Sequence, residues 1–185
     1  MQSDRGAKEW WRNGNWWILF ACPFISADYY GTQDSKGKMN LSSMQRSALD
    51  LYDWAKQQYP QSEIIIMGHS YGTGIATYLA SERKCKTLIL AAGYRDISDL
   101  HNKIIRNCSW FWTVTIIPIF LGPFKFFISN NICTKEYAKN VDSSVYIIGS
   151  KKDKTLNADL QKKLGACFEN AEIIIERCTS ISWMR

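Results

Sequence analysis

Residues 63–72 read EIIIMGHSYG, and this stretch decides the fold. The run EIIIM is rich in β-branched residues and predicts a strand buried on both faces in the middle of a parallel sheet. Residues 72–82 carry apolar side chains at helical spacing and predict a helix. The pattern Gly68-x-Ser70-x-Gly72 therefore lies at an abrupt turn from strand to helix, where the serine is strained and bulky neighbours would collide. We expect this turn to present Ser70 above the sheet as a nucleophile.

Short apolar runs alternate with helical patterns from residue 23 onward. The expected strands are residues 23–28, 63–67, 87–92, 144–148 and 171–175. Three helices are expected: one from Leu41 to just before Pro60, one over residues 72–82, and one over about residues 158–168. This order predicts an α/β fold, a mostly parallel sheet with helices on both faces. Residues 94–140 break the pattern, and we interpret them as a cap-like insertion within one domain of residues 1–185.

Composition narrows the classes of function. The 185 residues are 46% hydrophobic, enough for one core that buries roughly 70% of the unfolded surface. Lys and Arg outnumber Asp and Glu by 23 to 17, but they are scattered, so we expect no nucleic-acid partner. The six cysteines form no C-x-x-C pair, which indicates buried thiols, no metal site and no cofactor. The polar first residues do not resemble a signal peptide, and we expect a cytoplasmic protein.

One segment is unusually apolar. Residues 109–127 read SWFWTVTIIPIFLGPFKFF, close to the about 20 residues that a membrane-spanning helix needs. Pro118, Gly122 and Pro123 interrupt it, which favours a broken apolar surface helix or cap over a spanning helix. The segment is a candidate for lining a lipid site or for peripheral membrane contact, and simple packing over the sheet explains it equally well.

A family resemblance adds to this pattern. Residues 28–37, DYYGTQDSKG, resemble the D-Y-R-G-x-G-x-S-x-G turn of small single-domain α/β-hydrolases, a group of serine-aminopeptidase-like, monoacylglycerol-lipase-like and depalmitoylase-like enzymes. Asp50, Trp54 and the Ser70 turn follow in the same order. The resemblance implies an α/β-hydrolase fold and a serine hydrolase of ester, thioester or amide bonds, with lipid or long-acyl substrates ahead of peptides. Ser70 attacks, and the backbone N–H of Tyr71 stabilises the oxyanion.

In that family an acid follows a late strand in a G-x-x-D-type turn, and Asp153 matches it after Gly149. Asp153 is our candidate acid, whose role would be to orient a histidine and stabilise the imidazolium. Asp96 and Asp99, which follow the strand expected at residues 87–92, are the alternatives.

The chain departs from the family at two places. The resemblance places Ser180 where the triad histidine belongs, and the only histidines of the chain are His69 and His101. The loop that supplies a second oxyanion donor is not recognisable in residues 1–22, so we expect the N-terminal strands to be missing. Loss of a triad histidine costs about 10⁶ in turnover, and loss of an oxyanion donor about 10² to 10³. Two readings remain open: a truncated or diverged hydrolase, and a catalytically dead hydrolase-fold binding protein.

Overall fold

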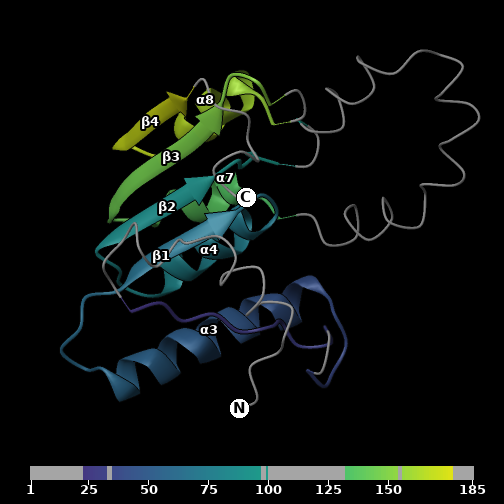
Figure 1. Cartoon of the computed structure of the whole chain (residues 1–185), viewed down its shortest axis with the longest axis vertical. Helices are drawn as coiled ribbons and strands as arrows, with labels where there is room; N and C mark the ends of the chain where they lie inside the picture. Colours follow the sequence, from purple (N-terminus) through teal and green to yellow (C-terminus); the bar gives the residue numbers. More distant parts are fainter. Residues whose placement is uncertain (1–22, 33–34, 97–98, 100–131, 154–155, 177–185) are drawn as a thin grey trace, which may run out of the picture.

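The computed structural model describes residues 23–32, 35–96, 99, 132–153 and 156–176. Four strands form one sheet: β1 (Ile65–His69), β2 (Thr87–Ala91), β3 (Ser144–Ser150) and β4 (Ala171–Glu176). They lie side by side in sequence order, and every neighbouring pair is parallel (Figure 1). The loops that follow the strands therefore gather at one edge of the sheet, where binding sites of open parallel sheets lie.

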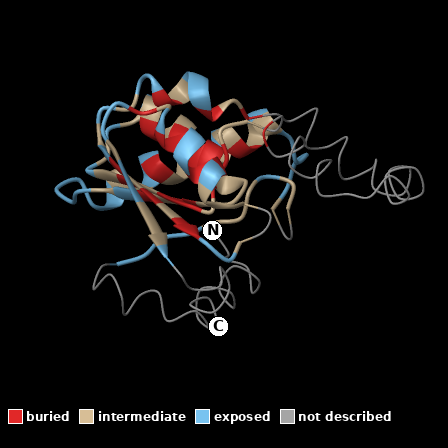
Figure 2. Ribbon diagram, turned by 90° about the horizontal axis from the view of Figure 1, so that it is seen from above, coloured by how far each residue is buried: buried red, intermediate tan, exposed pale blue. Residues whose placement is uncertain are grey.

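The described helices are α3 (Leu41–Gln58), α4 (Gly72–Glu82), α7 (Thr134–Ala138) and α8 (Ala158–Gly165). The side chain of Asn40 caps α3 by accepting from the Ser43 N–H at 2.9 Å. Figure 2 shows these helices gathered on one face of the sheet. Helices on both faces were expected, and in the part of the chain that the structure describes only one face carries them.

The main core lies between this helical face and the sheet. Alternate strand residues in register, such as Ile66, Leu88 and Val145, point toward the helices and are buried. They pack with residues of α3, α4 and α8 and of the segments around them; the buried set is Tyr52, Ile66, Ala76, Ala80, Leu88, Leu90, Ala138, Val145, Ile147, Leu164 and Phe168. The other set of alternate residues is less covered, and Ile65 is 46% exposed. Burial of β1 on both faces was predicted; its burial pattern has one buried face.

The helix at residues 72–82 and the strand starts at residues 87, 144 and 171 are confirmed. The strand predicted at residues 23–28 is wrong, since residues 23–29 form no regular element. Residues 23–28 have side chains that suit a strand, but a strand also needs a neighbouring strand to pair with. In the described sheet β1 pairs only with β2, and residues 23–28 do not pair with β1. The second predicted strand begins two residues late, at Ile65.

Much of the predicted insertion, including residues 109–127, lies outside the described residues, as do residues 1–22. Residues 132–138 at its end are part of the packed domain: Ile132 is 2% exposed and packs with Met44 and Ile75. Among the described helices, none has the length and apolar character needed to cross a bilayer.

Candidate functional site

Ser70 occupies the turn between β1 and α4 in a left-handed backbone conformation, with φ of +52°. A side chain in this region costs roughly 1–2 kcal/mol, so the conformation must be held by its surroundings. The Ser70 N–H donates to the Ala91 carbonyl at 2.9 Å, and the Ser70 carbonyl accepts from Thr73 N–H at 3.0 Å and from Thr73 Oγ1 at 2.6 Å. The strained turn expected from the sequence is present.

The two glycines of this elbow (residues 68–72) have different roles. A Cβ on Gly68 would lie 2.6 Å from the Gly72 carbonyl oxygen and 2.7 Å from Ala76 Cβ, so only glycine lets β1 approach α4 this closely. A Cβ on Gly72 would meet only the Tyr29 hydroxyl, at an ordinary 3.9 Å. The steric argument made from the sequence therefore holds at Gly68 and is wrong at Gly72, where the space stays open.

Tyr71 follows Ser70 at the N-terminal end of α4, with helical backbone angles. Burial, together with the nearby Tyr29 hydroxyl, raises the pKa of Tyr71 to about 12. Burial also raises the pKa of Tyr94, with Tyr71 as a further cause. Three neutral phenols from separate segments thus gather beside the elbow, a cluster that the sequence did not predict.

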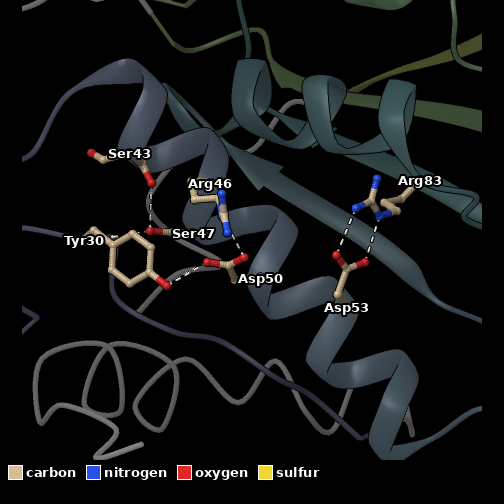
Figure 3. Close-up of polar contacts among 7 residues, drawn as sticks. All are labelled: Tyr30, Ser43, Arg46, Ser47, Asp50, Asp53 and Arg83. Atoms are coloured by element: carbon tan, nitrogen blue, oxygen red, sulfur yellow. Dashed lines mark hydrogen bonds and ion pairs between the residues drawn. The ribbon is translucent and has the colours of Figure 1, made fainter.

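Contacts with α3 hold the turn that carries Tyr29 (Figure 3). The Tyr30 hydroxyl donates to Asp50 Oδ2 at 2.8 Å, and its backbone N–H donates to Ser47 Oγ at 2.9 Å. Arg46 Nε donates to the other oxygen of Asp50 at 3.0 Å. Tyr30 stands where the family turn has arginine, and its hydroxyl contacts the carboxylate of Asp50. Tyr30 therefore anchors this turn to α3, and the neighbouring Tyr29 hydroxyl lies near Gly72 of the elbow.

Asp153 lies after β3, at the same sheet edge as Ser70. Its Oδ1 accepts from the Leu156 N–H at 2.8 Å. Burial lowers the pKa of His69, and the charge of Asp153 opposes that shift by raising it. The carboxylate is therefore close enough to act on the residue beside Ser70, although Asp153 lies 83 positions further along the chain (153 − 70).

The alternative acids have other partners. Asp99 is 8% exposed, and its carboxylate pairs with Arg95 at 2.9 Å and with Lys163 at 3.1 Å. Asp96 pairs with Arg95 at 3.3 Å. Asp96 and Asp99 therefore both face Arg95, whereas the charge of Asp153 acts on His69, the neighbour of Ser70.

His69 is half-buried and belongs to the strand residues that alternate with Gly68, so its side chain leaves the sheet on the face away from α4. His101 and Ser180 lie outside the described residues. Within the described residues, no three metal-ligating side chains come together, and Cys85, Cys133 and Cys167 are free thiols.

Sequence reasoning missed Gln161, which is fully buried and contacts the backbone of Gly93 and Leu156. One signal was available: Gln161 precedes Leu164 by three residues and so shares the apolar face of α8. A glutamine on such a face indicates a buried hydrogen-bond role.

Comparison with known proteins agrees with this geometry. The family model described as alpha/beta hydrolase fold matches residues 14–154. The lysophosphatidylserine lipase ABHD12 of Xenopus tropicalis is 31% identical over 151 residues, which cover 76% of this chain and 37% of the relative. The human protein ABHD12B is 28% identical over 157 residues, which cover 80% of this chain and 42% of that protein. This chain therefore spans well under half the length of these relatives.

Among solved structures, an esterase from Pyrococcus furiosus superposes with a TM-score of 0.71 at 17% identity, covering 97% of this chain and 71% of the esterase. A lipase-esterase related protein from Clostridium acetobutylicum gives a TM-score of 0.62 at 16% identity, covering 92% of this chain and 80% of that protein. At these identities the likeness concerns the fold alone.

Proposed function

Because this chain belongs to the alpha/beta hydrolase family, we propose that it is a serine hydrolase of ester, thioester or amide bonds with Ser70 as the nucleophile. The observation that carries the proposal is the left-handed backbone of Ser70 between a buried strand and a helix. Such strain persists only where the surrounding structure enforces it, and it is common at catalytic turns.

In the proposed reaction, Ser70 Oγ attacks the substrate carbonyl carbon and gives its proton to a general base. The backbone N–H of Tyr71 donates to the oxyanion of the tetrahedral intermediate. The intermediate collapses to an acyl-enzyme, and the leaving alcohol, thiol or amine takes the proton. Water then gives a proton to the base and attacks the acyl carbonyl carbon; the bond to Ser70 Oγ breaks, Oγ takes the proton back, and the carboxylic acid product leaves. Asp153 is the proposed acid that orients the base.

The base is the weak point of this site. Ser180 stands at the histidine position implied by the family resemblance, and a serine does not accept a proton near neutral pH. We therefore propose slow turnover, with reaction at Ser70 surviving through the elbow and the Tyr71 N–H. The second candidate function, a hydrolase-fold protein that binds without turning over, is favoured by this same substitution.

For the substrate we propose a lipid or other long-acyl compound. Two observations support this choice: the relative from Xenopus tropicalis is named a lysophosphatidylserine lipase, and residues 109–127 form an apolar, aromatic stretch. Such a stretch suits an acyl chain or a membrane surface.

A fluorophosphonate probe tests the nucleophile, because it reacts covalently with an activated serine. We expect labelling of the parent chain and of Ser81→Ala, and none of Ser70→Ala. Ser81 lies in the helix that follows the elbow, which makes it a matched control. Equal labelling of all three proteins would refute the assignment of Ser70.

A second experiment tests the missing base and the substrate class. We expect Ser180→His to hydrolyse p-nitrophenyl esters at least about 10²-fold faster than the parent, since a triad histidine is worth up to about 10⁶. Long-chain esters should gain more than the acetate. Labelling of Ser70 without any gain in hydrolysis would favour the binding protein, and a gain restricted to the acetate would argue against lipid substrates.

A further inference from the structure

Gln161 is a fully buried glutamine whose amide is completely used. Its Oε1 accepts from the Gly93 N–H at 3.2 Å, and its Nε2 donates to the carbonyls of Gly93 at 2.9 Å and Leu156 at 3.2 Å. A primary amide offers two N–H donors and a carbonyl acceptor, and here each is engaged. The side chain thus joins two loops that are 63 residues apart (156 − 93).

One of these loops carries the candidate acid. Leu156 is held from both sides, since its N–H donates to Asp153 Oδ1 and its carbonyl accepts from Gln161. The orientation of the Asp153 carboxylate is therefore connected to Gln161 through one residue. Gly149, in the strand before Asp153, also lies against Gln161: a Cβ there would be 2.5 Å from Gln161 Cγ.

The other loop leads to the nucleophile. A Cβ on Gly93 would lie 3.0 Å from both Thr73 Cγ2 and Thr73 Oγ1, so the Gly93 backbone packs directly on Thr73. Thr73 is 1% exposed and donates twice to the Ser70 carbonyl. A series of contacts, buried at Gln161, Gly93 and Thr73, therefore runs from Asp153 to the strained serine.

We propose that Gln161 is a positioning residue that sets the spacing between Ser70 and Asp153. The catalytic importance of that spacing rests on the proposed function, whereas the contacts through Gln161 are a property of the fold. Gln161 joins the loop after β2 to the loop after β3, and the packing of Gly93 on Thr73 extends this link to the loop after β1, which carries Ser70. The linking group is a neutral amide, which does not titrate.

Gln161→Met tests the link, because it keeps the length of the side chain and removes the three hydrogen bonds. Hydrogen exchange at the Leu156 N–H should accelerate by about tenfold, since Gln161 no longer holds the Leu156 carbonyl and the Leu156 N–H can move away from Asp153 Oδ1. The pKa of His69, followed by NMR and assigned with His69→Gln, should fall in the direction that Asp153→Asn also produces. If the methionine variant does not fold, Gln161→Glu replaces it in the test. It keeps the shape of the side chain but loses both N–H donors, and it should likewise accelerate exchange at the Leu156 N–H.

Gln45→Met is the matched control, since Gln45 Nε2 also donates a partly buried hydrogen bond, to Tyr137 Oη at 3.0 Å, but contacts neither loop. It should leave the Leu156 exchange and the His69 titration unchanged. A folded Gln161 variant with parent-like values for both measurements would overturn the proposal. Both readouts are independent of reaction at Ser70. Loss of fluorophosphonate labelling in every protein would therefore count against the hydrolase and leave the positioning role standing.

Discussion

The strain at Ser70 can be measured by comparing glycine with alanine at this position. Both Ser70→Ala and Ser70→Gly remove the hydroxyl, so the difference between them isolates the Cβ. At φ of +52° that Cβ costs about 1–2 kcal/mol. Glycine also loosens the unfolded chain, which costs about 0.4–1 kcal/mol. The difference between these two ranges runs from about 0 to 1.6 kcal/mol, and its midpoint predicts that Ser70→Gly is more stable than Ser70→Ala by about 0.8 kcal/mol.

Ser47, in the middle of α3, provides the control with the opposite sign. In a helix interior glycine is about 1 kcal/mol less favourable than alanine, so Ser47→Gly should be less stable than Ser47→Ala. The assay is urea unfolding of the four variants followed by circular dichroism, with a common slope for the denaturant dependence. If glycine were the less stable variant at both positions, Ser70 would not be strained, and the main support for the nucleophile would fail.

Three further predictions follow from the packing and charges of the same sheet edge. Gly68→Ala should destabilise the chain by about 1–3 kcal/mol, whereas Gly72→Ala, whose Cβ meets only Tyr29 at 3.9 Å, should be tolerated in thermal unfolding. Asp99→Ala should cost about 1–3 kcal/mol, below the value for fully buried pairs because Arg95 and Lys163 reach solvent, and should leave labelling of Ser70 intact. The pKa of Tyr71 is about 12 in the folded chain, against 10.0 normally, so the unfolded chain loses the Tyr71 proton at a lower pH than the folded chain does. The free energy of unfolding should therefore fall between pH 10 and about 12, and it should fall less steeply in Tyr71→Phe.

The parts of the fold that the sequence predicted well depend on local patterns. Helix α4 has the predicted bounds because its apolar spacing and the Gly68–Gly72 turn both mark its start. The strand beginning at Thr87 is similarly marked by the short apolar run of residues 88–92. Residues 23–28 show the limit of this reasoning, since a short run with apolar residues does not form a strand without a neighbouring strand to pair with.

Contacts between distant segments could not be predicted from the sequence. Nothing local to Asp99 shows that Lys163 pairs with it, so Asp96 and Asp99 stayed alternatives to Asp153 at the level of sequence. Nothing local to Gly72 shows that it faces open space toward Tyr29. Gln161 was missed for the same reason, because its partners Gly93 and Leu156 come together only when the strands pair in register.

The strain at this sheet edge is distributed over two neighbouring strand ends. Among the described residues, Ser70 after β1 and Ala92 after β2 are the non-glycine residues with positive φ, at +52° and +49°. Each is tied to the next strand, since the Ser70 N–H donates to Ala91 and the Ala92 N–H donates to Ile148, both at 2.9 Å. Ser70 is held by the end of β2, and the end of β2 is in turn held by β3. These contacts keep Ser70 in place whether or not a histidine stands nearby. In the proposed mechanism, a serine in place of the triad histidine removes the proton acceptor without disturbing the nucleophile, which is why Ser180→His is expected to restore turnover.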